Sequence, residues 1–375
     1  MKKIQMVDLT TQYENIKKEM DEAIIGVVQS GQYINGGAVK EFADELATFT
    51  GAKFAIPCAN GTDALQIALM SLNLLPGDEV IVPAFTYAAT AEVIGLLRLT
   101  PVLVDVSPLS FNIDTNKIEE AISPKTKAII VVHLFGQCVD MEPVLDIAEK
   151  YNLRVIEDNA QSIGSVYTFS DGTKAQAGTM GDIGTLSFFP SKNLGCYGDG
   201  GAILTNNEEL AASLKMIASH GQAKKYIHQV IGCNSRLDTL QAAILKTKLP
   251  YLNNYIEKRQ KAAHSYNTGL RLLTDIIEVP FNMENSTHVY HQYTLKIKDG
   301  KRDELQAHLA KYNIPTMIYY PLPLHKQPAF KDIVRLGGEL TVAETLCDSV
   351  LSIPIHTELE SEQLFYIIEK IATYE

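Results

Sequence analysis

From Phe54 onward the chain alternates short apolar runs with longer amphipathic stretches, and this alternation limits the possible folds more than any other feature. Strands that are buried on both faces appear as nearly continuous apolar runs, which is typical of a parallel sheet covered by helices. We therefore expect an α/β fold with a mixed, mostly parallel central sheet and helices on both faces. The apolar runs lie within residues 54–58, 78–84, 100–106, 127–134 and 153–158.

The pattern differs at the two ends of the chain. Residues 1–50 suggest two helices around the turn at residues 30–37, and residues 237–272 suggest a long helical segment interrupted near Pro250. Beyond it, a strand at 291–298 and a helix at 303–311 indicate a second core. The chain of 375 residues is long enough for two domains, which we predict at 1–248 for a large domain and 249–375 for a smaller α/β domain.

Composition excludes several classes of function. A net charge of −11 and a pI near 5.4 argue against general nucleic-acid binding, which needs an excess of lysine and arginine. No window approaches the roughly 18 uninterrupted apolar residues of a membrane span. The amino terminus meets an acid before an apolar core develops, so we expect no signal peptide. Five cysteines without paired spacing favour free thiols in a reducing compartment, so we expect a cytoplasmic protein.

Lys192 stands between an apolar run and a glycine-rich segment. Leu186 to Phe189 should form a buried strand, so Lys192 emerges near the sheet edge where α/β enzymes place their sites. Glycines at 198, 200 and 201 let the following backbone pass close to a bulky group. A partly desolvated lysine in such a place can lose its proton and attack a carbonyl. We therefore predict Schiff-base chemistry at Lys192, against the ordinary expectation of a solvated surface lysine.

A second apolar run ends in the acids Glu157 and Asp158 and is followed by Gln161. A carboxylate there suits the ring nitrogen of pyridoxal phosphate, because it keeps the ring protonated and able to accept electrons. Asp158 fits this role, and Gln161 can reach the same ligand. The alternative is that both acids only solvate the strand end. His133, at another strand end, is interpreted as structural; with no metal partner at ligand spacing, we predict no metal site.

The first βα join resembles an anion site. Gly61 permits a tight turn, and Thr62 and Asp63 stand where a helix begins, so free N–H groups and the helix dipole face an anion there. A simple N-cap explains Thr62 equally well. After the next apolar run, Tyr87 suits a ring stacked on a pyridine face, and the alternative is that Phe85 or Tyr87 fills the core.

Two of these segments together resemble a known family. Ile156-Glu-Asp-Asn-Ala-Gln161 followed by Ser187-Phe-Phe-Pro-Ser-Lys192 resembles the DegT/DnrJ/EryC1/StrS sugar aminotransferase family of fold type I pyridoxal-phosphate enzymes, over essentially the whole chain. The resemblance implies an aspartate-aminotransferase-like fold, the cofactor pyridoxal 5'-phosphate and a homodimer with shared active sites. Segments 58–65, 195–202 and 234–243 most resemble the branch that aminates C3 of a UDP-linked 3-keto-hexuronic acid.

The resemblance also implies roles for single residues. Lys192 and Asp158 are expected to be catalytic. Asn234 and Arg236 lie on a loop that crosses the dimer interface in the family, so Asn234 would contact the neighbour's cofactor phosphate and Arg236 a substrate carboxylate or phosphate. The expected cofactor-binding residues are Gly61, Thr62, Tyr87, Asp158, Gln161, Ser187, Lys192 and Asn234. The expected substrate-binding residues are Arg236, Tyr319 and Tyr320. Related members of the branch often have histidine at the position of Tyr319.

The implied reaction transfers an amino group from L-glutamate to a keto group of a nucleotide-linked sugar. The branch points to C3 of UDP-2-acetamido-2-deoxy-3-oxo-glucuronic acid, for a bacterial surface polysaccharide such as the O-antigen of lipopolysaccharide. One alternative is amination at C4 of a 4-keto-6-deoxy nucleotide sugar. Another is a regulator that binds the cofactor without turnover. The net negative charge and the absence of a helix-turn-helix appendage argue against this alternative. Lys192 argues against the family's dehydratase variant, which has histidine there.

Overall fold

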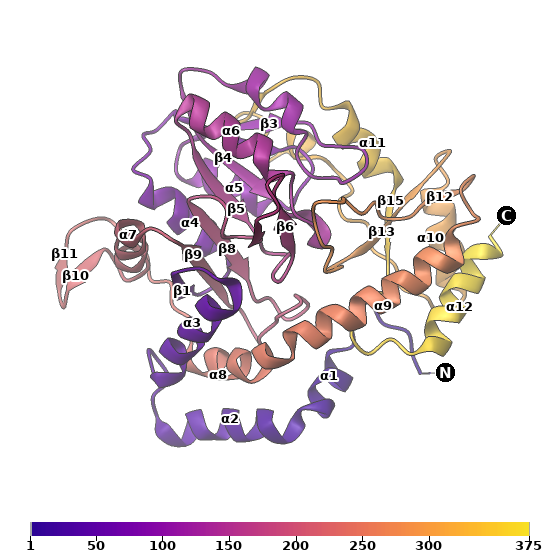
Figure 1. The fold of residues 1–375 in the computed structure, drawn as a ribbon, viewed down its shortest axis with the longest axis horizontal. Coiled ribbons are helices and arrows are strands. Elements are labelled where there is room, and N and C mark those ends of the chain that lie inside the picture. The colour runs from indigo at the N-terminus through magenta and orange to yellow at the C-terminus, as the bar shows by residue number, and fades with distance from the viewer. Residues whose placement is uncertain (1, 375) are drawn as a thin grey trace.

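The computed structural model describes residues 2–374; residues 1 and 375, which end the two predicted domains, lie outside the described residues. Figure 1 shows a large body around a central sheet and a smaller part that contains the end of the chain, with helix α9 (Leu252–Leu270) running between them. The other helices are α1 (Leu9–Asn15), α2 (Lys17–Ser30), α3 (Gly37–Thr50), α4 (Gly61–Ser71), α5 (Ala89–Leu96), α6 (Met141–Tyr151), α7 (Glu208–Ala218), α8 (Thr239–Lys248), α10 (Arg302–Lys311), α11 (Thr341–Ser349) and α12 (Ser361–Ala372).

The central sheet has eight strands in the order β1-β9-β8-β5-β4-β2-β3-β14. Strand β9 runs antiparallel to β1 and β8, and all other neighbouring strands are parallel. The predicted mixed, mostly parallel sheet is therefore confirmed. Its strands are β1 (Phe54–Cys58), β2 (Glu79–Pro83), β3 (Thr100–Val104), β4 (Thr126–Val132), β5 (Arg154–Asp158), β8 (Ile183–Ser187), β9 (Gly201–Thr205) and β14 (Arg335–Leu336).

Helices cover both faces of this sheet. In strand β4, Ile130 and Val132 pack into one core cluster with residues of α4, α5 and α7, whereas Ile129 and Val131 pack into another with residues of α6. Alternate side chains of one strand thus enter two cores, which explains why its sequence is a continuous apolar run. Among the described residues, no helix has the length and apolar character needed to cross a bilayer.

The amino-terminal segment has three helices where the sequence suggested two. The backbone leaves the helical conformation at Ile16, which is buried, so α1 and α2 are separate helices. The predicted turn is present: α2 ends at Ser30, the next residue Gly31 adopts the left-handed conformation, and α3 begins at Gly37. Both α2 and α3 pack on α8.

The smaller part has its own antiparallel sheet of β12 (Ile277–Glu278), β13 (Tyr293–Ile297) and β15 (Val350–Ile353). Its core includes Tyr266 of α9, Leu305 of α10 and Ile367 of α12. The chain nevertheless returns to the large body, because β14 pairs with β3 and Leu346 of α11 packs into a core of the large sheet. The exact division at residues 248 and 249 remains a prediction.

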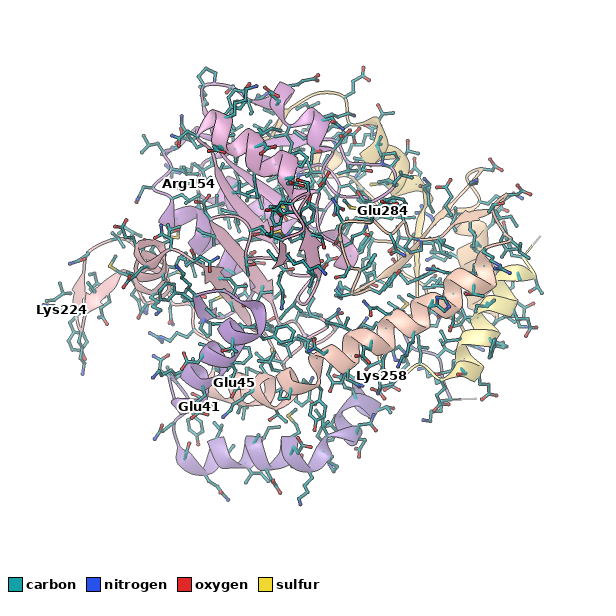
Figure 2. All side chains as sticks on the ribbon, viewed as in Figure 1. Glu41, Glu45, Arg154, Lys224, Lys258 and Glu284 are labelled. Carbon is teal, nitrogen blue, oxygen red and sulfur yellow. The ribbon has the colours of Figure 1, made fainter. Side chains whose placement is uncertain are left out.

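Two short hairpins complete the fold. The Gly-, Ser- and Thr-rich sequence of residues 164–181 suggests a loop or a small hairpin that projects from the body. Strands β6 (Val166–Thr168) and β7 (Lys174–Gln176) form a hairpin there, but Tyr167 is fully buried, so this hairpin packs on the body. Strands β10 (Gln222–Lys224) and β11 (Ile227–His228) extend away from α7 at the left of Figure 1, and Figure 2 places Lys224 at their outer end.

Asp105 joins the C-terminal segment to the large sheet. Its side chain is 2% exposed and accepts hydrogen bonds from the backbone N–H groups of Val342 (3.1 Å) and Ala343 (2.8 Å), in the first turn of α11. Lys117 pairs with the same carboxylate at 3.2 Å. Because the first N–H groups of a helix have no partner within the helix, the carboxylate supplies acceptors that α11 lacks.

We expect Asp105→Ala to lower the free energy of unfolding by about 2 kcal/mol, since one buried and one partly buried N–H group lose their acceptor. Urea denaturation followed by circular dichroism measures this change. The matched control is Asp332→Ala at an exposed position, which should change stability by less than about 0.5 kcal/mol. Equal stabilities of the two variants would show that Asp105 does not anchor α11.

Candidate active site

The site begins where two neighbouring parallel strands end. Asp158 is the last residue of β5 and lies opposite Thr185 of β8. After β8 the chain turns, and the backbone N–H of Lys192 donates to the carbonyl of Phe189 at 2.8 Å. The predicted buried strand ended too late, at Phe189: β8 ends at Ser187 and Phe189 is 52% exposed. The reason is Pro190, which cannot donate to a strand ladder.

Lys192 and Asp158 influence each other electrostatically. Burial lowers the pKa of Lys192 to about 8, and the negative charge of Asp158 partly opposes this effect. Burial raises the pKa of Asp158, whose side chain is 6% exposed. The carboxylate accepts hydrogen bonds from the backbone N–H of Ala160 (3.2 Å) and the hydroxyl of Thr90 (3.0 Å), and these bonds favour the charged form. The site therefore keeps an amine that loses its proton easily near a buried carboxyl group whose charged form is favoured by two hydrogen bonds.

Glu157 has a different role from Asp158. It is fully buried and accepts a hydrogen bond from His133 Nε2 at 2.8 Å. It also accepts three bonds from the backbone N–H groups of Gly178, Met180 and Gly181. The Nδ1 atom of His133 accepts from a backbone N–H, so Nε2 carries the proton. His133 is thus structural, as interpreted, whereas the alternative that both acids solvate the strand end is wrong, because both are buried.

The predicted anion site lies at the amino terminus of α4. Asn60 caps this helix by accepting from the N–H of Asp63 at 2.8 Å, so the alternative of a cap at Thr62 is wrong. Among the described residues, the N–H groups of Gly61 and Thr62 have no recorded acceptor. A Cβ atom on residue 61 would lie 2.7 Å from Cβ of Ser187. Only glycine lets the helix end approach Ser187, and the resulting cup of N–H groups and a hydroxyl fits a phosphate.

Aromatic and amide groups form another side of the site. Tyr87 is 60% exposed whereas Phe85 is buried, so Phe85 fills the core and Tyr87 does not. The Tyr87 ring centroid lies 6.2 Å from that of Tyr320. Gln161 accepts from a backbone N–H at 2.8 Å and donates to the Tyr320 hydroxyl at 3.2 Å, and the Tyr319 ring lies 6.0 Å from Tyr320. The structure therefore brings Gln161, Tyr87, Tyr319 and Tyr320 together.

Asn234 and Arg236 are not linked by side-chain hydrogen bonds to Gln161 or the three tyrosines. Asn234 is exposed and forms an isolated backbone bridge with Ser219, and no recorded side-chain hydrogen bond links Asn234 or Arg236 to another described residue. Between them, the buried hydroxyl of Ser235 accepts from the N–H of Ala59 at 3.0 Å. The loop therefore lies beside the turn that precedes α4, and the ligands of Asn234 and Arg236 remain a proposal.

Sequence reasoning missed Thr90, although its hydroxyl is a direct partner of Asp158. The residue stands in the first turn of α5, and a threonine at a helix start gives no local signal of this contact. The glycines after Lys192 also have a different role from the one expected. A Cβ on residue 201 would lie 2.4 Å from the carbonyl oxygen of Asn60, and one on residue 198 would lie 2.9 Å from Gln241 Nε2. Because they lack a Cβ atom, these glycines allow other parts of the chain to approach closely.

The arrangement fits pyridoxal phosphate. The cup at Gly61 and Ser187 suits its phosphate, Asp158 its ring nitrogen and Lys192 its aldehyde. The buried hydroxyl of Thr86, next to Tyr87, has no hydrogen-bond partner among the described residues, which leaves a polar atom for a ligand. This fold and site define the class of pyridoxal-phosphate enzymes that use a Schiff-base lysine.

Comparisons with known proteins narrow this class. The model of the DegT/DnrJ/EryC1/StrS aminotransferase family matches residues 14–372, and the chain belongs to this family. It is 46% identical over 372 residues to the pleiotropic regulatory protein of Geobacillus stearothermophilus, covering 99% of this chain and 98% of that one. It is also 46% identical over 361 residues to the UDP-2-acetamido-2-deoxy-3-oxo-D-glucuronate aminotransferase of Pseudomonas aeruginosa, covering 96% and 97%.

A solved structure agrees with the sequence relatives. The chain aligns with DesV of S. venezuelae, solved in complex with a ketimine intermediate, with a TM-score of 0.94 and 37% identity, covering 99% of this chain and 98% of that one. The fold is thus that of the pyridoxal-phosphate aminotransferases, as predicted. The protein is a pyridoxal-phosphate-dependent sugar aminotransferase.

We expect the cofactor-free enzyme to capture added pyridoxal phosphate at a rate that rises with pH and levels off above a midpoint of about 8, because only the neutral amine of Lys192 attacks an aldehyde. In Asp158→Asn the midpoint should move to lower pH, since the lost negative charge had favoured the ammonium form. Stopped-flow absorbance measures the rate.

The matched control is Asp332→Asn, which removes an exposed carboxylate and should leave the midpoint unchanged. A midpoint in Asp158→Asn that stays in place or moves to higher pH would contradict the electrostatic link between Asp158 and Lys192.

Proposed function

We propose that this enzyme transfers the amino group of L-glutamate to C3 of UDP-2-acetamido-2-deoxy-3-oxo-glucuronate, in the synthesis of a bacterial surface polysaccharide such as O-antigen. The observation that carries the proposal is the near-full-length similarity to the Pseudomonas aeruginosa aminotransferase named for this substrate. The site supports it with an amine, a buried carboxylate and a phosphate cup. Anionic substrates must be met by local cations, because the chain as a whole has a net charge of −11.

The cofactor, when bound, supplies the ring that accepts electrons from the substrate carbon. The residues of this chain hold it and move the proton. The amine of Lys192, with its pKa lowered to about 8, has an accessible neutral form that would move a proton between the amino-acid Cα and the bound cofactor. Asp158, fixed by Thr90 and Ala160, keeps the ring nitrogen protonated. Gly61, Thr62 and Ser187 anchor the phosphate.

Other groups suit the sugar. Gln161 braces Tyr320 through a hydrogen bond of 3.2 Å, and burial raises the pKa of Tyr320, so its hydroxyl stays protonated and able to donate. Tyr319 lies beside it, and we propose that both tyrosines line the sugar pocket. Arg236 suits the sugar carboxylate, because its planar guanidinium binds a carboxylate through two parallel hydrogen bonds.

We also propose a homodimer with shared sites. Asn234 is exposed and has no recorded side-chain partner among the described residues, as expected for a side chain whose ligand lies on another copy. In the dimer, Asn234 would contact the cofactor phosphate of the partner. All five cysteines are free thiols, which supports a reducing compartment and hence the cytoplasm.

Two alternatives make different use of the same site. A C4 aminotransferase for a 4-keto-6-deoxy nucleotide sugar needs the same Lys192 chemistry and differs only in the sugar pocket. A regulator without turnover is favoured by one observation, the name of the Geobacillus stearothermophilus relative. A lysine with a lowered pKa beside a buried carboxylate favours turnover instead.

We expect glutamate to bleach the yellow absorbance of the cofactor-loaded enzyme. After removal of glutamate, UDP-linked 3-keto-hexuronate should restore the absorbance and a 4-keto-6-deoxy nucleotide sugar should not, because the proposed reaction takes place at a C3 ketone. Lys192→Ala is the control and should neither bleach nor turn over. Recovery with the 4-keto sugar alone would move the assignment to C4, and no bleaching by glutamate would favour the regulator or another donor.

The shared site predicts subunit complementation. Lys192→Ala and Arg236→Ala should each lose activity as homodimers, whereas mixing the two after reversible dissociation should restore part of it, because some mixed dimers assemble one intact site. The steady-state rate of the mixture measures this recovery. A mixture as inactive as its parents, with mixed dimers detected by mass spectrometry, would place Arg236 and Lys192 in the same protomer's site.

A further inference from the structure

The protein contains a buried lysine outside the groups described so far. Lys248 is the last residue of α8 and its side chain is 1% exposed. No ion pair is recorded for it within residues 2–374. Its Nζ atom donates to the carbonyl oxygen of Gly195 at 2.8 Å and lies 4.3 Å from the ring centroid of Tyr197. The amine is therefore held by one carbonyl and one aromatic face.

Such a position is costly for an amine. Removal of an ammonium group from water without a paired carboxylate is unfavourable, and burial lowers the pKa of Lys248 to about 8. A methionine of similar length would fill the space at lower cost. The specific contribution of Lys248 is thus the hydrogen bond to Gly195, and its importance depends on what Gly195 controls.

Gly195 lies three residues after Lys192, within the same closed turn. The N–H of Cys196 donates to the carbonyl of Phe188 at 2.9 Å and closes this turn at its base. A Cβ on residue 195 would lie 2.3 Å from the carbonyl oxygen of Pro190, so the two sides of the turn touch. A displacement of the carbonyl of Gly195 therefore also displaces the backbone that holds Lys192.

A second residue of α8 holds the same turn. Gln241 accepts from the backbone N–H of Tyr197 at 2.9 Å and donates to the Tyr197 carbonyl at 3.3 Å. Gln241 and Lys248 are seven residues apart, which places them on one face of the helix two turns apart. One face of α8 thus binds residues 195–197 through three hydrogen bonds.

We propose that Lys248 is a positioning residue for Lys192: by holding the carbonyl of Gly195, it fixes the backbone of the lysine turn relative to Asp158. The inference rests on the role of Lys192 in the proposed function. When the Lys192 amine moves a proton, its position depends on this backbone. A displacement of about 1 Å in a catalytic group lowers a rate by about 10²-fold.

The test compares Lys248→Met with Lys246→Met. Lys246 is on the same helix but is partly exposed and pairs with Glu41 and Glu45, which Figure 2 labels on α3. Both variants should bind pyridoxal phosphate, and borohydride should trap it on Lys192 in both. In Lys248→Met the pH midpoint of the yellow absorbance should shift, and single-turnover bleaching by the amino donor should slow by about 10²-fold. Lys246→Met should match the wild type in both measurements.

The outcomes separate positioning from simple stabilisation. A lower melting temperature in Lys248→Met with an unchanged midpoint and bleaching rate would overturn the proposal. If Lys248→Met does not fold, two other variants replace it: Lys248→Gln, which retains a hydrogen-bond donor, and Gln241→Leu, which removes the hydrogen bonds to Tyr197. A shifted midpoint in Gln241→Leu with a smaller shift in Lys248→Gln supports the proposal. Wild-type midpoints in both variants overturn it. The midpoint needs no sugar or glutamate, so it gives an answer even if the proposed substrates are wrong.

Discussion

The structure depends most on the electrostatic balance between Lys192 and Asp158. Asp158 is buried and Lys192 is partly buried, and burial alone favours the neutral form of both. Their mutual attraction, with the donors Thr90 and Ala160, favours the charged carboxylate and opposes the effect of burial on the pKa of Asp158, while the lysine stays close to deprotonation. An exposed pair would be screened by water and would keep the ordinary pKa of a lysine. The chemistry of the site therefore requires a fold that shields both groups from most of the solvent.

The parallel sheet meets this requirement through its geometry. Neighbouring parallel strands end at the same edge, so Asp158 at the end of β5 and the turn after β8 are brought together without a long loop. Glycines then allow close contacts between backbones. Gly61 brings the amino terminus of α4 against Ser187, and Gly201 brings β9 against Asn60. The phosphate cup and the lysine turn are thus parts of one closely packed assembly.

The sequence predicts the sheet, the lysine turn and Asp158, because apolar runs and the residues just after them are local signals. It does not predict contacts made across the fold. Thr90 looks like any threonine at a helix start, and nothing local shows that its hydroxyl faces a carboxylate 68 positions away. Lys248 looks like the basic last turn of an amphipathic helix, which ordinarily faces water. Its burial follows only from the packing of α8 on the lysine turn, which local pattern cannot show.

Asp158, which serves the chemistry, and Asn234 and Arg236, which are proposed to bind ligands, differ in their hydrogen bonding within one chain. Asp158 has its hydrogen bonds supplied within the chain, by α5 and by the turn after β5. Asn234 is exposed and Arg236 only partly buried, and neither has a recorded side-chain partner among the described residues. A buried network changes only at a high energetic cost, whereas an exposed loop changes at little cost. With the proposed roles of Arg236, Tyr319 and Tyr320, a change of sugar substrate is therefore easiest at these residues, while the amine chemistry stays with the sheet.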